Sequence, residues 1–513
     1  MKKEEKIKSF NRKTIFITLL ISLLTILLLT TGCCQLGSGV TSFLENVKDQ
    51  QESESSNQEK PVSDIKEEDE ATKEEEDERI APGDDSPYWV LAIGGEGRDY
   101  APSVTLTDDG FVAVGMTTSF GHGSGTNNLD GSHDFMAVRL DKKGELMWST
   151  VIGGPEDERG SFSVTSTSDG GFLLTGTTQS FGSGGADLFV VKLDPRGRLK
   201  WARAIGGSGQ ETGKTTLEVD GGFISLGDTT SAGAGKRDLL AVKFDRDGNI
   251  IWANAIGGME DDTGAGISEI NGGFIIGGTI WSYGAGGADG CFIKIDDSGD
   301  VQWSKTVGGS GDEGINWDGV RVLSDGGFVL GEGTTSYGAK KQAICAMRLD
   351  SDCDVEWALL IDGPGDDAGW TMNKTPDGYI AGGKYDMAQD GGDTVYIKID
   401  NNGEYLWART LGDERLDEIE EILPADQGYI MSGVTRLAEP NGDFLIAKVN
   451  SDGYVGGDSD PVQELSPMSI TSVNPGVNSF SPMQTDVSTL IKVLSVSPDV
   501  ETPDLRISFI HSN

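Results

Sequence analysis

The chain has 513 residues, of which 74 are glycine and 36% are hydrophobic, and its formal net charge is −42. Much glycine with few apolar residues favours many short elements joined by tight turns and argues against long helices. A body this acidic repels phosphate backbones, which excludes nucleic acid from the expected partners, and solubility is a sufficient reason for the charge.

Residues 1–34 have the pattern of a targeting segment. Six lysines and arginines precede an apolar run from Thr14 to about Thr31, and Gly32 and Cys33 follow. The pattern resembles a bacterial lipoprotein signal, although Thr30 stands where leucine is usual in that family. The resemblance implies that Cys33 becomes the acylated N-terminus. The alternative is an uncleaved anchor helix, because a run of this length can just span a bilayer. Both interpretations predict attachment to the membrane, with most of the chain outside the cytoplasm.

Residues 35–87 are rich in Glu, Ser, Gln and Lys and contain almost no aromatic residues. Such a segment cannot bury enough apolar surface to offset its chain entropy, so we expect a disordered, self-repelling tether. Beyond it the cysteines are Cys291, Cys345 and Cys353, without a CxxC pair. They support neither a disulfide framework nor a zinc site and are expected to be buried.

A repeat decides the architecture of residues 88–457. Its tryptophans recur 50 to 59 residues apart, at Trp89, Trp148, Trp201, Trp252, Trp303, Trp357 and Trp407. Between them four short runs return in the same order, which in the second copy are GSFSVTSTSDG, GFLLTGTTQS, ADLFVVKLD and GRLKWARAIGG. Each run has strand character and ends at a turn signal. We name the four predicted strands of a unit a, b, c and d.

Four antiparallel strands repeated at this period are typical of a β-propeller. Seven a–b–c triplets are present, and the last lacks its d strand, whereas an orphan d strand begins at Tyr88. The sequence therefore predicts an all-β, seven-bladed propeller of four-stranded antiparallel blades, in which the N-terminal strand completes the last blade. An open ring would leave two unpaired strand edges.

The repeat resembles prokaryotic secreted β-propeller repeat proteins with the pattern GGxxxD…DGGFxxxGxT…DxxxxKLDxxGxxxW. This resemblance implies the fold and little about activity. A fainter likeness links the tryptophans to quinoprotein repeats, but those enzymes have eight blades and a vicinal disulfide, so no quinone cofactor is expected. Residues 458–513 are rich in Ser, Pro and Val. They are expected either to run extended along the propeller or to form a small accessory strand pair.

An acid recurs four residues after the second glycine of each crossing between units, and in the seventh crossing Asp413 takes the place of that glycine. The seven are Asp99, Glu158, Glu211, Asp262, Glu313, Asp367 and Asp417. In one interpretation each accepts backbone N–H groups within its own turn. In the other they form a ring of anions that attracts Ca²⁺ or a cationic ligand. Because an acid occurs in every copy, the structural interpretation is favoured, and no cofactor is expected.

We expect functional residues at positions where one copy of the repeat differs from the other copies. Copies three to six contribute aromatic and polar candidates for ligand binding: Trp281, Trp317, Trp370, Tyr385, Glu332, Asp228, Asn316 and Asp318. Aromatic faces beside carboxylates and amides suit sugar rings or a cationic peptide. The plain alternative is that these tryptophans pack between blades. The long first b–c loop, with His122, Asp130, His133 and Asp134, could hold a divalent metal, but its composition is that of a mobile loop.

The sequence holds no Ser/His/Asp set, Cys/His pair, Walker loop or HExxH motif. The first hypothesis is therefore a membrane-tethered, monomeric binding or scaffold propeller that recognises a glycan or protein through its loop face. The alternative is a carbohydrate-active hydrolase or lyase that uses carboxylates at the channel mouth.

Overall fold

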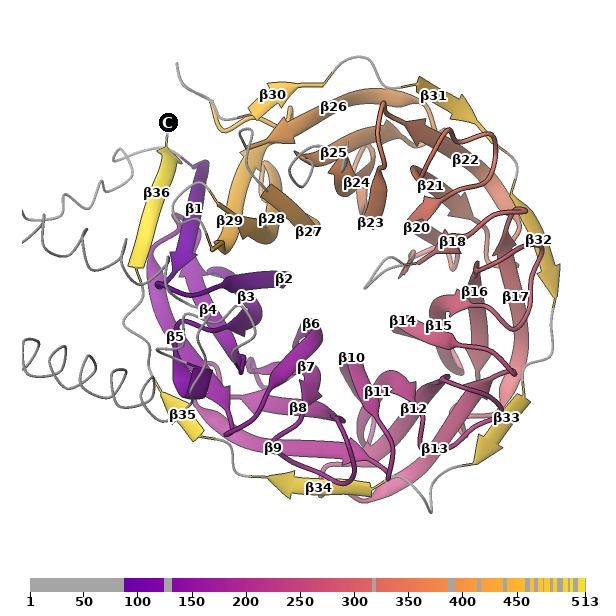
Figure 1. Ribbon diagram of the computed structural model, residues 1–513. Helices are drawn as coiled ribbons and strands as arrows, with labels where there is room; N and C mark the ends of the chain where they lie inside the picture. The colour runs from indigo at the N-terminus through magenta and orange to yellow at the C-terminus, as the bar shows by residue number, and fades with distance from the viewer. Residues whose placement is uncertain are drawn as a thin grey trace, which may run out of the picture. The chain divides into compact units, whose positions relative to one another are not determined.

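The computed structural model describes residues 87–123, 132–315, 320–385, 393–412, 417–436 and 441–456, with seven short stretches between residues 462 and 512. In these residues the only helix is the 3-10 turn η1 (Gly121–Gly123). The strands form seven antiparallel sheets that surround a central axis as the blades of a propeller (Figure 1). The predicted fold class is confirmed.

The two inner strands of each blade approach the axis of the ring. The innermost are β2 (Asp99–Thr107), β6 (Glu158–Ser166), β10 (Glu211–Val219), β14 (Asp262–Ile270), the interrupted pair β18 (Glu313–Gly314) and β19 (Val320–Val322), β23 (Ala368–Thr375) and β27 (Asp417–Ala425). The second are β3 (Gly110–Thr117), β7 (Phe172–Thr178), β11 (Gly222–Thr229), β15 (Gly273–Ile280), β20 (Phe328–Thr334), β24 (Gly378–Tyr385) and β28 (Gly428–Thr435). In blade 5 the innermost strand is described in two pieces, β18 and β19, which both pair with β20.

The third and fourth strands lie further out. The third are β4 (Asp134–Asp141), β8 (Asp187–Leu193), β12 (Asp238–Asp245), β16 (Asp289–Ile295), β21 (Ala343–Leu349), β25 (Asp393–Asp400) and β29 (Asp443–Asn450). The fourth are β5 (Leu146–Gly153), β9 (Leu199–Gly206), β13 (Ile250–Gly257), β17 (Val301–Gly308), β22 (Val355–Asp362), β26 (Tyr405–Leu411) and, in blade 7, β1 (Trp89–Gly94).

The ring closes as predicted, because β1 pairs with β29. Trp89 lies opposite Lys448, and Ile93 lies opposite Phe444. Every residue of β1 is buried. The N-terminal strand is therefore an integral part of blade 7, and the seventh sheet has no missing member.

A fifth strand on every blade comes from the C-terminal segment. These strands are β30 (Val462–Glu464), β31 (Ser469–Ser472), β32 (Gly476–Ser479), β33 (Met483–Asp486), β34 (Lys492–Val496), β35 (Asp499–Glu501) and β36 (Arg506–Ser512). They pair in turn with the fourth strands of blades 6, 5, 4, 3, 2, 1 and 7. The segment runs extended around the circumference, in yellow in Figure 1, and we call it the belt.

The recurring tryptophans pack between blades, and five of them make a ring contact with the aromatic residue near the start of strand b of the next blade. Trp252 and Trp303 share a hydrophobic cluster with the corresponding Phe274 and Phe328. Trp148 meets Phe172 with ring centroids 6.0 Å apart, and Trp357 meets Tyr379 at 5.3 Å. The glycine of the c–d turn covers such an indole: a Cβ on Gly197, whose φ is +74°, would lie 2.6 Å from the Trp148 ring. Each aromatic pair contributes about 0.5–1.5 kcal/mol beyond its buried area, and the glycine is needed for close approach.

Candidate functional site: the crossing face

The carboxylate of each crossing lies inside its own turn. In six crossings it accepts the N–H of the second glycine, four residues earlier, at 2.5 to 2.8 Å. The seventh, Asp417, accepts the Thr435 hydroxyl at 2.5 Å. All seven side chains are at most 1% exposed. These acids therefore hold the turns together and do not form an open anionic ring.

The glycine pair of the crossing is explained by the same contacts. A Cβ on Gly206 would lie 1.9 Å from Oδ1 of Asp187 and 2.6 Å from Oε2 of Glu211, so two carboxyl groups occupy the space beside this residue. A Cβ on Gly258, the second glycine of its pair, would lie 2.4 Å from the Ser282 side chain. Neither position can carry a larger residue without displacing a neighbour.

Burial changes the protonation of the aspartate that lies beside a crossing acid. Burial, with a further contribution from the Glu211 charge and in spite of the Ser183 N–H, raises the pKa of Asp187 to about 7. Within the described residues Oδ1 of Asp187 has no hydrogen-bond partner. Burial also raises the pKa values of Asp238 and Asp289, which occupy the same position in blades 3 and 4.

One sequence candidate, Trp281, stands at the mouth of a cavity. Its side chain is 44% exposed, and its backbone N–H donates to the Asp262 carboxylate at 2.9 Å. The cavity, of about 380 Å³, lies between blades 4 and 5 on the face that carries the crossings and b–c loops. We call this the crossing face. Apart from Trp281, polar side chains line much of the cavity: Lys214, Thr263, Asp312, Thr335 and Gln342.

An equivalent groove between blades 2 and 3 has a volume of about 510 Å³. There Gln179 occupies the position of Trp281, and Arg159 that of Thr263. Because grooves occur at equivalent places between two pairs of blades, a groove at this place is a feature of the repeated fold and not of blades 4 and 5 alone. The exposed indole distinguishes the groove between blades 4 and 5.

Asp228 and Glu332 lie in the interior, away from this cavity's mouth. Asp228 accepts the Gly264 N–H at 2.7 Å and the Thr212 hydroxyl at 2.8 Å, so it links blade 3 to blade 4. Glu332 is fully buried, and neither of its oxygens has a hydrogen-bond partner among the described residues. Burial, with Glu313 and Asp289 nearby, raises the pKa of Glu332 well above its usual value. Burial without a hydrogen-bond partner therefore favours the neutral form of this carboxyl group.

The other aromatic candidates within the described residues, Tyr385 and Trp370, both belong to blade 6. Tyr385 packs into the core between blades 5 and 6, where its ring would meet a Cβ on Gly363 at 2.4 Å. Rings at related positions, such as Phe181 and Tyr283, pack in the same way on crossing glycines, so the arrangement is a property of the repeat. Trp370 is partly buried on β23. Asn316, Trp317 and Asp318 lie outside the described residues.

The first b–c loop does not present its polar residues together. His133 Nδ1 lies 2.8 Å from Oδ1 of Asp157, which belongs to the next crossing, and Asp134 accepts the N–H of His122. Asp130 lies outside the described residues. Across the part of the chain that the structure describes, no group of three or more His, Cys, Asp or Glu side chains could hold a metal ion.

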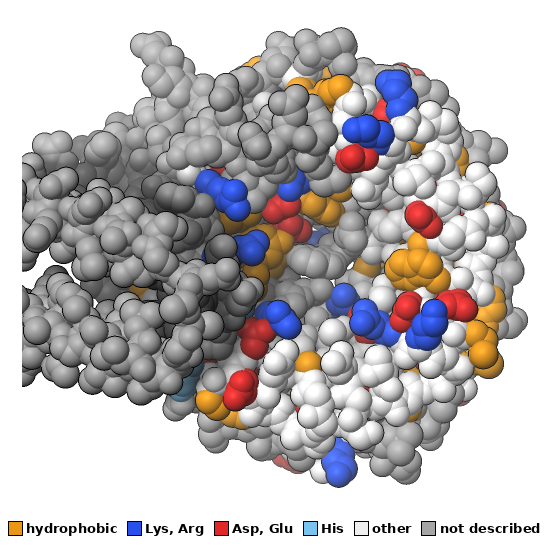
Figure 2. Space-filling model, viewed as in Figure 1, with side chains coloured by type: hydrophobic (Ala, Val, Ile, Leu, Met, Phe, Trp, Pro, Cys, Tyr) orange, Lys and Arg blue, Asp and Glu red, His pale blue; other side chains and the backbone are white. Residues whose placement is uncertain are grey.

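Sequence reasoning missed a polar network on the inner strands. Arg321 of blade 5 donates to Asn373 of blade 6 at 3.1 Å and to Glu421 of blade 7 at 2.7 Å. The Glu421 carboxylate also accepts the Ser103 hydroxyl of blade 1 at 3.0 Å. Four blades are thus joined near the axis by one chain of contacts. Figure 2 shows side chains of both charges around the hollow at the centre of the ring.

Two carboxylates on β27 complete this inner surface. Glu418 pairs with Lys384 at 2.9 Å. Burial and the neighbouring Glu418 charge raise the pKa of Glu420 to about 8, against the lowering effect of the Tyr100 hydroxyl. Glu420 lies at the irregularity of the β27–β28 ladder between Ile419 and Glu421, and the Glu418 charge is near enough to act on its carboxyl group. The sequence signal was the run Asp-Glu-Ile-Glu-Glu at the start of β27.

In comparisons with known proteins, no protein-family model and no curated protein matches the sequence. Within the described residues, no helix has the length and apolar character needed to cross a membrane. Cys33 and the apolar run before it lie outside those residues.

Proposed function

We propose that the protein is a membrane-tethered, extracytoplasmic binding module that recognises a glycan through the crossing-face cavity between blades 4 and 5. The observation that carries the proposal is Trp281, an exposed indole at the mouth of a cavity of about 380 Å³. Sugar rings stack on such apolar faces, and the hydroxyl, amide and carboxylate groups of Thr263, Gln342 and Asp312 suit their hydroxyls. The lipoprotein-like segment ending at Cys33 supports the extracytoplasmic placement.

A screen of neutral oligosaccharides by thermal shift, with the full chain, tests this proposal. We expect a glycan that stabilises the wild-type protein and loses that effect in Trp281→Ala. Gln179→Ala, at the same position of the groove between blades 2 and 3, is the matched control and should bind as the wild type does. No shift with any glycan, or equal binding by Trp281→Ala, would overturn the proposal and favour a protein ligand.

The second candidate function, a carbohydrate-active enzyme, is favoured by the pair Glu418 and Glu420. A carboxyl group held protonated near neutral pH can act as a general acid beside an ionised partner. The crossing carboxylates are buried within turns and do not offer such a pair. Release of reducing ends from an oligosaccharide by the wild type and its loss in Glu420→Gln would support this function, and binding without turnover would exclude it for that substrate.

A further inference from the structure

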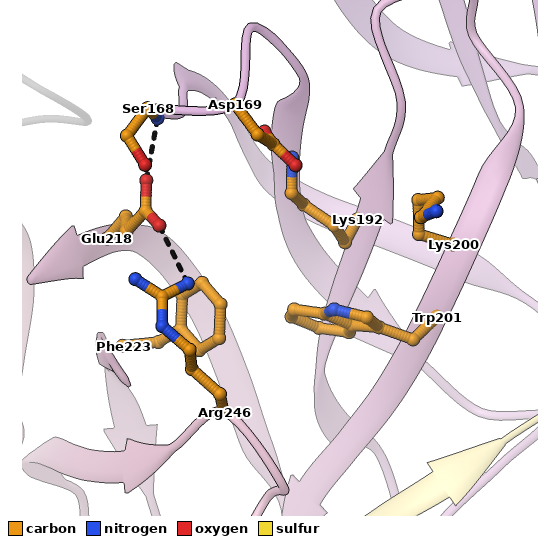
Figure 3. Close-up of a pocket in the computed structure, with 8 residues that line it drawn as sticks. All are labelled: Ser168, Asp169, Lys192, Lys200, Trp201, Glu218, Phe223 and Arg246. Carbon is orange, nitrogen blue, oxygen red and sulfur yellow. Dashed lines mark hydrogen bonds and ion pairs between the residues drawn. The ribbon is translucent and has the colours of Figure 1, made fainter. Parts of the chain in front are cut away.

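A second cavity lies on the opposite side of the propeller from the crossings. It opens between blades 2 and 3, has a volume of about 250 Å³, and is lined by side chains from two hairpin turns and the strands beside them (Figure 3). Ser168 and Asp169 come from the turn after β6, and Arg246 comes from the turn after β12. We call this side the hairpin face.

Two aromatic rings form the apolar part of the cavity. Trp201 of β9 and Phe223 of β11 meet edge to face, with centroids 5.2 Å apart. The Arg246 guanidinium lies 5.7 Å from the centroid of Phe223. In Figure 3 the indole of Trp201 lies below Lys200 and Lys192, with the open space beside it.

More cationic than anionic side chains line the cavity. Three cations, Lys192, Lys200 and Arg246, line it against two carboxylates, Asp169 and Glu218. Both carboxylates are engaged in contacts of the fold. Asp169 pairs with Lys192 at 2.7 Å. Glu218 accepts the Ser168 N–H at 2.7 Å and pairs with Arg246 at 2.9 Å. The surplus charge is therefore positive, in a chain whose net charge is −42.

Lys200 distinguishes the interface between blades 2 and 3 from the other interfaces between neighbouring blades. The residue before each recurring tryptophan is Tyr88, Met147, Lys200, Ile251, Gln302, Glu356 or Leu406. Only the copy in blade 2 is cationic, and the c–d turn that faces it in blade 3 carries Arg246 at its second position. The pairing Lys192–Asp169 recurs elsewhere, as Lys398–Asp377 and Arg348–Asp325, and so belongs to the repeat. The combination of Lys200 and Arg246 does not recur in the other copies.

The geometry points to a second ligand site that binds one acidic sugar residue, a hexuronate, with its ring against Trp201 and its carboxylate at Lys200, while Arg246 lies on the other side of the cavity. An aromatic wall takes the apolar face of a sugar ring, and an ammonium takes a carboxylate. The volume lies below the range of pockets for drug-sized ligands, which fits a single ring whose neighbours in a chain lie outside. Trp281 and the crossing face play no part in this site.

Calorimetric titration of the full-length protein with galacturonate oligomers tests the inference. The wild type should bind them and should not bind galactose oligomers of the same length at this site. Lys200→Gln should weaken binding about tenfold or more, because it removes a charge-assisted contact. Lys200 is exposed, so this variant should fold normally. Lys142→Gln, at the position of Arg246 in the turn of blade 1, should bind as the wild type does.

Three outcomes would overturn the inference. One is the absence of binding to galacturonate oligomers at millimolar concentrations. Another is equal affinity for wild type and Lys200→Gln. The third is an equal affinity for inorganic phosphate, which would show attraction of a simple anion without recognition of a sugar. A separate variant, Arg246→Ser, removes the cation on the other side of the cavity and should weaken binding less than Lys200→Gln does.

Discussion

Trp89 lies opposite Lys448 in the ladder between β1 and β29, so the first described strand and the last strand of the seventh repeat belong to one sheet. On its other side β1 pairs with β36, the last strand of the belt. β1 is thus held between two neighbouring strands, with backbone hydrogen bonds on both of its edges.

Removal of the belt should destabilise the propeller. Deletion of residues 457–513 exposes the outer edge of all seven blades, and each lost backbone hydrogen bond contributes about 0.5–1.5 kcal/mol. We expect a lower unfolding temperature and self-association, measured by calorimetry and light scattering. A shorter deletion of residues 502–513 removes only β36 and should weaken the closure at β1. An unchanged unfolding temperature in both variants would show that the belt does not stabilise the ring.

The glycine pair should resist substitution. Gly206→Ala places a Cβ where Asp187 and Glu211 already lie, and we expect a loss of about 1–3 kcal/mol in the free energy of unfolding. Gly314→Ala is the matched control, because nothing lies within 4 Å of its Cβ, and it should change stability by less than about 1 kcal/mol. Denaturant titration measures both. Equal effects would mean that the space beside Gly206 adapts.

The contribution of Asp187 to the free energy of unfolding should decrease as the pH rises. Its pKa in the folded state is about 7, above the ordinary value of 3.8, so the native protein holds this proton more tightly than the unfolded chain. The contribution of Asp187 is therefore fully present below about pH 4 and is lost as the pH rises through about 7. The difference in unfolding free energy between wild type and Asp187→Asn, followed from pH 4.5 to 8, should change in favour of the variant as the pH rises.

The matched control for this titration is Asp194→Asn. Hydrogen bonds from Arg198 and the turn overcome desolvation and lower the pKa of Asp194 to about 2, so its stabilisation is present at neutral pH and is lost only in acid. Over the same pH range its difference from wild type should stay level. A level difference for Asp187→Asn as well would contradict the paired burial of Asp187 and Glu211.

Loss of the inner-strand network should cost more than loss of a surface pair. Arg321→Ala leaves the buried Glu421 without its cation, and we expect a loss of about 2–5 kcal/mol. The exposed pair Lys142–Asp426 is the control, and Lys142→Ala should cost less than about 1 kcal/mol. Denaturant titration of both variants compares them. The Glu421 carboxylate also accepts the Val104 N–H at 2.8 Å. Similar small losses would show that this contact and the Ser103 hydroxyl alone satisfy Glu421.

Cys33 should be the lipidated residue. Cys33→Ala is expected to abolish incorporation of labelled fatty acid in a bacterial host and to leave an uncleaved precursor. Cys34→Ala, one residue later, is the matched control and should still be labelled. Absence of label in the wild type, with the protein retained in the membrane fraction, would instead favour the uncleaved anchor over residues 1–34.

The chain's own periodicity was sufficient to predict the seven blades and their closure. Each unit repeats its turn glycines, its Trp and the apolar start of strand b, and these local signals act within about 50 residues. The belt was not predicted beyond an extended segment. Its strands have three to seven residues, too few to show an amphipathic pattern, although prolines at 461, 467, 475, 482, 498 and 503 precede six of them.

What the sequence alone determined is therefore the architecture, because repeated short-range turns and strand patterns can lead to only one kind of closed sheet assembly. What only the tertiary structure decided is which residues are available to a ligand. Tyr385 and Asp228 looked like candidates until packing showed them between blades. The burial of the crossing acids in their turns agrees with the structural interpretation that their repetition favoured. Lys200 and Arg246 looked ordinary until two blades placed them around one cavity. Exposure and proximity depend on contacts between distant segments, and a linear pattern does not contain them.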